Sequence, residues 1–168
     1  DGALSEHQGG LAAGSTRRGI APVYADKMFR NGIRMIDLLE PIVFREKLEK
    51  GYAFAKGIIE KALNQTLDIS IDEIFDTYLD YGKQLAPYIN DTSIVLYKAH
   101  KSGRSILFEG AQGISLDVDH GVYPYTTSSN TAAGHISTGT GVSFRDIDRI
   151  IGVTKAYLSR VGESPLPS

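Results

Sequence analysis

The sequence has no cysteine, no long apolar run and no excess of charge of one sign. Without cysteine, a disulfide framework and thiolate chemistry are excluded. No apolar run reaches the length of a membrane span and no signal peptide opens the chain, so we expect a cytoplasmic protein. The 18 basic and 20 acidic residues nearly balance, which indicates neither a nucleic-acid partner nor a membrane surface. A length of 168 residues suits about one domain.

The first 40 residues combine a loop with a basic helix. Residues 1–21 are rich in glycine, alanine and serine, which is typical of a mobile loop. Residues 23–40 are expected to be helical, and their spacing puts four charged side chains on one face: Asp26, Lys27, Arg30 and Arg34. The plain interpretation of that face is solvated surface.

Residues 41–104 have the periodicity of three helices and form a predicted helical subdomain. The first helix covers residues 41–63, begins with Pro41 and carries an apolar stripe: Phe44, Leu48, Tyr52, Ala55, Ile59 and Ala62. Ser70 is a candidate N-cap of a second helix that ends before Pro87. Asp91 is expected to cap a third helix that ends before Gly103. These helices suggest packing rather than chemistry.

Residues 105–168 have the pattern of an α/β core. Residues 105–109 and 150–158 are short apolar runs, as in the buried strands of a parallel sheet. The long segment between them has little periodicity and follows the carboxyl end of a predicted strand. Ligands bind at that position in open α/β sheets. We therefore predict a partial parallel sheet with an inserted helical subdomain.

The most informative segment covers residues 108–135. It passes from a strand into a glycine turn around Gln112 and then into the hydroxyl-rich run 126–130. The Gln112 amide can both donate and accept hydrogen bonds, so it can contact a nucleotide base or, equally, its own turn. Residues 14–19 add two arginines and two hydroxyls, which suit phosphate. The two clusters together suggest a phosphorylated small molecule, although neither is a P-loop.

Acidic and histidine residues in the same segment raise the alternative of a metal site. They are of ligand type: Asp117, Asp119, His120 and His135. Their spacing matches no strong ligand motif, so the favoured interpretation is that they shape the turn. A metal-dependent hydrolase using Asp119 and His120 is a minor alternative. No serine lies in a nucleophile-elbow pattern.

Three blocks of sequence carry a family resemblance: GSTRRGIAPVYADKMFRNGIRMIDL, FEGAQGISLDVDHGVYPYTTSSNTAAG and IGVTKAYLSRVGESPLP. In order and spacing they resemble the middle portion of adenylosuccinate synthetase, a P-loop-NTPase-like synthetase fold. The resemblance implies GTP-dependent ligation of IMP and L-aspartate with Mg²⁺, through a 6-phosphoryl-IMP intermediate. It also implies a homodimer, with no nucleic-acid or membrane partner.

The resemblance implies roles for particular residues. Thr16 and Thr127 match ligands of the IMP 5′-phosphate, and Arg30 matches the arginine that reaches this phosphate across the dimer interface. Gln112 matches the residue at the 6-position of the purine, and Leu116 lines the same pocket. As neighbours in these loops, Arg18 and Asn130 are weaker candidates.

The chain departs from the family pattern and lacks parts of it. Arg17 and Ala21 stand where the family has glycines, so we expect a stiffer loop, and Glu163-Ser164 stands where Ala/Glu-Gly is usual. The glycine loop, the catalytic aspartate and histidine, the Mg²⁺ ligands and the aspartate and guanine sites are expected outside this chain. We therefore expect a fragment, inactive alone, with no catalytic residue of its own and Gln112 in support. The alternative is a non-catalytic nucleotide-binding or regulatory module.

Overall fold

The structure is a computed structural model that describes residues 1–9, 16–157 and 159. The chain forms two compact units that divide between Asn90 and Asp91, with Thr16 assigned to the second. None of the helices in the described ranges has both the length and the apolar character needed to cross a membrane. The expected domain boundaries at residues 40 and 104 stay predictions.

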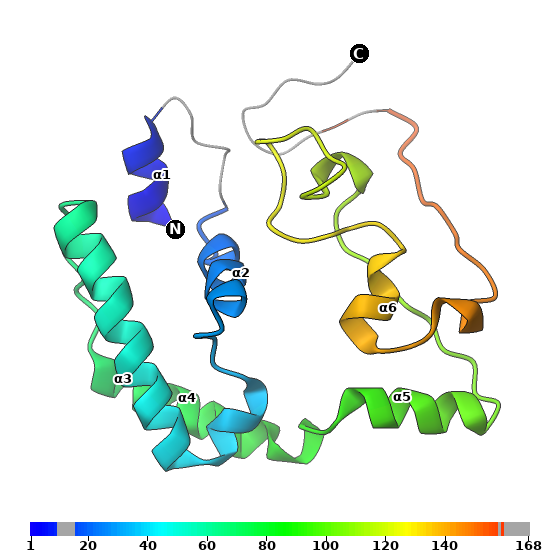
Figure 1. Ribbon diagram of the computed structural model, residues 1–168, viewed down its shortest axis with the longest axis horizontal. Coiled ribbons are helices and arrows are strands. Elements are labelled where there is room, and N and C mark those ends of the chain that lie inside the picture. The colour runs from blue at the N-terminus through cyan, green and yellow to red at the C-terminus, as the bar shows by residue number, and fades with distance from the viewer. Residues whose placement is uncertain (10–15, 158, 160–168) are drawn as a thin grey trace. The chain divides into compact units, whose positions relative to one another are not determined.

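The first unit is built from helices (Figure 1). They are α1 (Gly2–Gln8), α2 (Ile20–Phe29), the 3-10 helix η2 (Met35–Leu39), α3 (Pro41–Gly57), the π-helical turn η3 (Ile58–Ala62), α4 (Ile71–Leu85) and the 3-10 turn η4 (Ala86–Tyr88). Pro41 is the first residue of α3, and the Ser70 side chain accepts a hydrogen bond from the Asp72 backbone N–H at the start of α4. Both predicted helix starts are confirmed.

The core of the first unit lies between η2, α3 and α4. Leu38, Phe44 and Leu48 are buried, and α4 covers them with four partly buried apolar side chains: Ile71, Ile74, Phe75 and Leu79. Part of the apolar stripe predicted in residues 41–63 is therefore core, with Phe44 and Leu48 at its centre.

Two expectations for the first 40 residues were wrong. Residues 2–8 form a helix rather than a loop. The helix predicted over residues 23–40 ends at Phe29, because Arg30 turns into the left-handed conformation at φ 64° and its N–H bonds back to the Lys27 carbonyl. Arg34 follows in an extended conformation. The basic residues consequently do not share one helix face.

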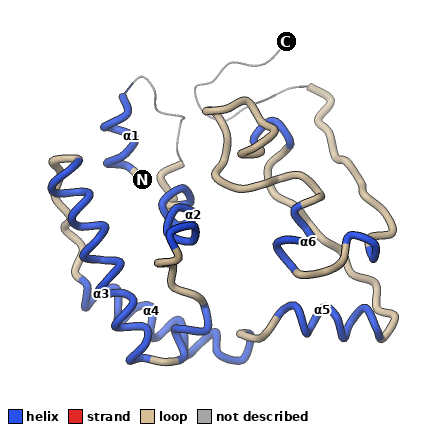
Figure 2. Tube along the Cα trace, in the orientation of Figure 1, coloured by secondary structure: helices blue, strands red, loops and turns tan. Residues whose placement is uncertain are grey.

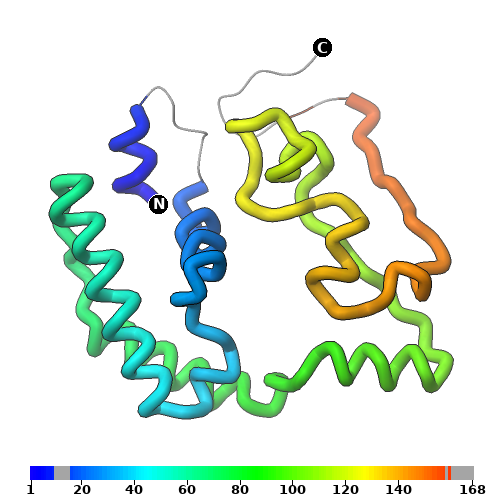
Figure 3. The backbone as a smooth tube through the Cα atoms, in the orientation of Figure 1, coloured from blue at the N-terminus to red at the C-terminus, as the bar shows by residue number. Residues whose placement is uncertain are grey.

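The second unit holds fewer helices and longer loops. Its helices are α5 (Thr92–Lys101), η5 (Ile114–Leu116), α6 (His135–Thr140) and η6 (Phe144–Asp146). The Asp91 carboxylate accepts from the Ser93 and Ile94 N–H groups at the start of α5, which confirms the predicted cap. In Figure 3 the chain leaves α5, runs away from it and returns to α6. The chain between α5 and α6 therefore includes nearly all of residues 108–135, the most informative segment of the sequence.

The predicted parallel sheet was wrong for the residues that the structure describes, because none of them forms a strand (Figure 2). Residues 105–109 and 150–157 are loop, and residue 158 lies outside the described residues. Leu107 is 86% exposed and Val153 is 95% exposed. A parallel strand needs paired neighbours and covered faces, and the apolar pattern of these runs does not by itself supply either.

Candidate functional site

Backbone hydrogen bonds bring two of the predicted binding residues together in the second unit. The Thr127 N–H donates to the Leu116 carbonyl at 2.8 Å, and the Val118 N–H donates to the Ser129 carbonyl at 3.2 Å. Both Leu116 and Thr127 are half-buried. The hydroxyl-rich run therefore lies against the short helix η5, although about ten residues of chain separate the two.

Gln112 occupies a turn immediately before η5. Its backbone is in the left-handed conformation at φ 60°, and its side chain is exposed. Left-handed backbone is uncommon for residues other than glycine and tends to cluster at ligand sites. The neighbouring Gly113 carbonyl accepts a hydrogen bond from the Thr131 hydroxyl at 2.9 Å. The turn is therefore also linked to the residue that follows the hydroxyl-rich run 126–130.

Asp117 lies at the centre of this loop region and is fully buried. Its Oδ1 accepts from the backbone N–H groups of Asp119 at 2.9 Å and His120 at 3.1 Å. Its Oδ2 accepts from those of Thr131 at 2.5 Å and Ala132 at 3.2 Å. Burial raises the pKa of the Asp117 carboxyl, but these N–H donors outweigh it and hold the pKa well below its usual range. The group is a carboxylate at physiological pH.

Besides Asp117, two of the four candidate metal ligands, Asp119 and His135, have hydrogen-bond partners in the second unit. Asn130 Nδ2 donates to Asp119 Oδ2 at 2.6 Å, and His135 Nδ1 lies 2.9 Å from the Thr138 hydroxyl. Within the described part of the chain, no three His, Cys, Asp or Glu residues come close enough to hold a metal ion. Asn130, a weaker candidate for ligand contact, uses its amide inside the loop.

Gly121 marks a close approach within the same loop. A Cβ atom added there would lie 2.4 Å from the Asp117 carbonyl oxygen and 2.6 Å from the Ser115 carbonyl oxygen. The Gly121 N–H donates to the same Asp117 carbonyl at 2.8 Å. The chain can therefore fold over η5 only with glycine at this position.

The remaining predicted site residues lie on other segments. Thr16 is exposed and is assigned to the second unit, while residues 14 and 15 of the predicted phosphate cluster lie outside the described residues. Arg30 is exposed at the carboxyl end of α2 in the first unit. Arg17, which replaces a glycine of the family pattern, takes a left-handed φ of 57°. Arg18 is exposed beside it.

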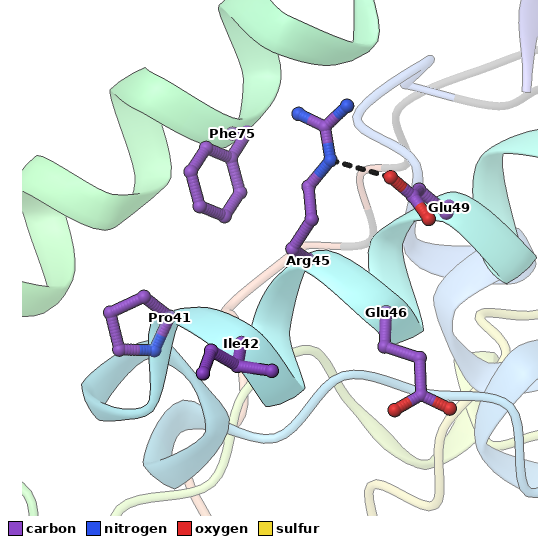
Figure 4. Close-up of a pocket in the computed structure, with 6 residues that line it drawn as sticks. All are labelled: Pro41, Ile42, Arg45, Glu46, Glu49 and Phe75. Carbon is purple, nitrogen blue, oxygen red and sulfur yellow. Dashed lines mark hydrogen bonds and ion pairs between the residues drawn. The ribbon is translucent and has the colours of Figure 1, made fainter.

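A surface groove of the first unit is lined by charged side chains, as a binding site could be, but its arginine forms ion pairs within the unit (Figure 4). Its lining residues are Pro41, Ile42, Arg45, Glu46, Glu49 and Phe75. The Arg45 guanidinium lies 5.3 Å from the Phe75 ring centroid and pairs with Glu49 at 2.7 Å and Asp72 at 2.6 Å. Since two carboxylates already balance its charge, the groove is not a candidate anion site.

The sequence analysis favoured a turn-shaping role for Asp117, which its bonds to the Asp119 and His120 N–H groups confirm, but it did not anticipate the bonds to Thr131 and Ala132. The bonds to Asp119 and His120 are local. Aspartate commonly accepts hydrogen bonds from the backbone N–H groups two and three residues later, so such a turn can be recognised in a sequence. The bonds to Thr131 and Ala132 join residues 14 and 15 positions apart, and no local pattern reveals them.

Comparison with known proteins gives a consistent result. The profile of the adenylosuccinate synthetase family matches residues 1–168. An adenylosuccinate synthetase from Bacillus anthracis is 50% identical over 155 residues, which cover 92% of this chain and 36% of that protein. One from Streptococcus gordonii is 47% identical over 163 residues, covering 97% and 38%. The chain thus spans just over a third of the length of these relatives.

A solved structure extends the agreement to the fold. The fully ligated adenylosuccinate synthetase from Plasmodium falciparum superposes with a TM-score of 0.85 at 30% sequence identity. The match covers 98% of this chain and 38% of that one. The chain belongs to the adenylosuccinate synthetase family.

Proposed function

We propose that this chain holds part of the IMP site of an enzyme that joins IMP and L-aspartate to form adenylosuccinate and converts GTP to GDP and phosphate. In the reaction, the γ-phosphoryl group of GTP passes to the 6-oxygen of IMP, which gives GDP and 6-phosphoryl-IMP. The aspartate amine then attacks C6, and inorganic phosphate leaves with the oxygen. Phosphorylation is needed because an unmodified oxygen at C6 is a poor leaving group.

The observation that carries this proposal is the hydrogen bond from Thr127 to Leu116 in a chain of this family. A phosphate ligand and a pocket residue for the purine belong on adjacent backbone if both serve one nucleotide. Gln112, exposed in a left-handed turn a few residues away, has an amide suited to the 6-position of the purine. Thr16 would add a second hydroxyl to the phosphate.

Arg30 fits the part of a residue supplied to a partner's site. It is exposed at the carboxyl end of α2, where its backbone is in the left-handed conformation. Arginine suits phosphate because its guanidinium donates two hydrogen bonds at once. A homodimer in which Arg30 completes the IMP site of the partner is therefore part of this proposal, as is a cytoplasmic location.

The Mg²⁺ ion expected in this reaction does not fit the residues described here. No group of three carboxylates or imidazoles gathers in those ranges, and Asp117, the buried carboxylate of the candidate IMP loop, has both oxygens occupied by backbone N–H groups. No step is assigned to a metal on this chain. Its ligands would come from other parts of the enzyme, and the 168-residue chain alone should be inactive.

The test is substrate dependence in the full-length enzyme. GTP should be converted to GDP and inorganic phosphate over many turnovers only when IMP and L-aspartate are both present, with adenylosuccinate formed in equal amount. GTP turnover without IMP, or none with both substrates, would refute the proposal. The isolated chain should bind IMP weakly and turn over none of it, whereas a regulatory module would bind IMP without help from the remaining segments.

A further inference from the structure

A buried carboxylate joins the two arms of the candidate IMP loop. Asp117 is one of only two charged residues that are buried in the described ranges, the other being Asp37. Burying a carboxylate is costly unless hydrogen bonds replace its water. Here four backbone N–H groups supply them, two from the turn 117–120 and two from the arm 130–132.

We propose that Asp117 is a positioning residue for IMP, whose two carboxylate oxygens clamp the turn 117–120 to the arm 130–132 and so set the spacing of Leu116 and Thr127. The inference rests on the proposed function, because it assigns Asp117 a task within that IMP site. Asp117 itself would not touch the nucleotide, since it is fully buried.

The connection to the binding residues is short on both sides. Leu116 immediately precedes Asp117, and its carbonyl accepts the Thr127 N–H. The Thr131 N–H binds the Asp117 carboxylate while the Thr131 hydroxyl binds the Gly113 carbonyl at 2.9 Å, next to Gln112. Loss of the clamp would therefore move all three candidate IMP residues relative to one another, and shifts of about 1 Å can reduce rates by about 100-fold.

Only a carboxylate satisfies this arrangement. Four backbone N–H groups donate to the two carboxylate oxygens, two to each. Both atoms must therefore accept hydrogen bonds, and neither can be replaced by a donor. Asparagine would turn an NH₂ group toward either the Asp119 and His120 pair or the Thr131 and Ala132 pair, which sets donor against donor. Alanine would leave all four N–H groups without this acceptor in a partly buried loop, at the cost of lost hydrogen bonds.

The donors belong to the loop and not to the helices that pack the unit. Residues 119, 120, 131 and 132 all precede α6, and Asn130, which adds a weaker 3.4 Å bond to Oδ1, lies in the same loop. Removal of the clamp should loosen the IMP loop more than it destabilises the whole protein. A purely structural aspartate would affect every substrate alike.

The experiment compares Asp117→Asn in the full-length enzyme with the matched control Asp148→Asn, an exposed acid of the same unit. KM for IMP, KM for GTP, kcat and the unfolding midpoint are measured together. We expect KM for IMP to rise about tenfold or more with KM for GTP within about twofold, while Asp148→Asn changes neither. Peptides covering residues 128–134 should exchange amide hydrogens faster in Asp117→Asn.

A second variant guards against misfolding of the first. Thr131→Val keeps the Asp117 carboxylate and removes only the hydroxyl bond to Gly113, so KM for IMP should rise in the same direction by a smaller factor. Unchanged KM for IMP in both variants, or equal losses for IMP and GTP, overturns the clamp. A wild-type enzyme that leaves IMP unconverted overturns the proposed function instead, and the two failures are thereby distinguished.

Discussion

The rings of Phe44 in α3 and Phe75 in α4 stack with their centroids 5.3 Å apart and their planes 18° from parallel. Phe44 is only 2% exposed, so this pair is the centre of the first unit's core. Offset aromatic pairs stabilise a protein beyond the area that they bury. The contact explains why α3 and α4, joined by a long connection, pack along one another.

Truncation of Phe44 should destabilise the protein strongly. We expect Phe44→Ala to lower the free energy of unfolding by about 3–5 kcal/mol, because it removes a buried ring and leaves a cavity. Urea denaturation of the full-length enzyme measures the change. Phe44→Leu keeps an apolar side chain and should cost clearly less. A loss below about 0.5 kcal/mol for Phe44→Ala would show that this core does not hold the unit.

Two glycines within helices should respond to alanine in opposite directions. A Cβ at Gly82 in α4 would lie 2.8 Å from both the Cβ and the carbonyl oxygen of Leu38, so Gly82→Ala should destabilise by about 1–3 kcal/mol. Gly51 in α3 has no atom within 4 Å of such a Cβ. Gly51→Ala should therefore stabilise by about 0.5–1 kcal/mol through helix propensity.

Comparing the two glycine variants by thermal unfolding isolates the effect of packing, since both remove the same backbone freedom. The same sign for both variants would contradict the close approach between α4 and η2.

The buried carboxyl of Asp37 should make stability depend on pH. Burial raises its pKa, but hydrogen bonds from Lys47 Nζ and the Arg34 N–H, each 2.7 Å long, outweigh burial and hold the pKa below its usual value. A carboxyl with a lower pKa in the folded state contributes stability above its unfolded pKa and loses it as pH falls through the folded pKa. The contribution should therefore be lost below about pH 4.

The check is the difference in unfolding free energy between wild type and Asp37→Asn, measured from pH 7 to pH 3. The difference should shrink as the pH falls. Lys47→Met removes one of the two donors and should show the same trend with a smaller amplitude. A difference that stays constant over this range would mean that the carboxylate form of Asp37 adds nothing.

Local signals predicted the starts of α3, α4 and α5 because the causes of those starts are local. Pro41, Ser70 and Asp91 each act within a few residues of the helix start that they mark. The helix α1 was missed because its contacts are distant: Gln65 Nε2 donates to Glu6 at 2.6 Å, and the Gly19 N–H donates to the Asp1 carboxylate. Four of its seven residues favour helix, namely alanine, leucine, glutamate and glutamine, but the glycine-, alanine- and serine-rich sequence that follows favours a loop.

The sheet was predicted wrongly and the bonds of Asp117 were not anticipated for the same reason, because both depend on residues far away in the sequence. Apolar runs such as 105–109 show that a segment can be buried, but strand formation depends on partners elsewhere. The loop of the candidate site stands out in the sequence because glycine and hydroxyl residues are concentrated there, and its role in binding stays a prediction. The link from Asp117 to Thr131 spans 14 positions, so it emerged only from the fold.

Arg30 should affect IMP and not GTP. We expect Arg30→Leu in the full-length enzyme to raise KM for IMP by about tenfold or more, because loss of a charge-assisted contact to phosphate costs well over 1 kcal/mol. Lys50→Leu, which removes another exposed cation of the first unit, serves as the control. Equal changes in KM for IMP and GTP would exclude the interface role.

Gln112 offers a way to separate backbone strain from side-chain function. Its φ of 60° costs a residue other than glycine about 1 kcal/mol or more. Gln112→Gly should therefore be more stable than Gln112→Ala by about 1 kcal/mol, since both lose the amide and only glycine relaxes the backbone. If the amide contacts the purine, both variants should lose activity to the same extent. Full activity in Gln112→Gly would instead assign Gln112 to the turn alone, and equal stabilities would contradict the left-handed backbone.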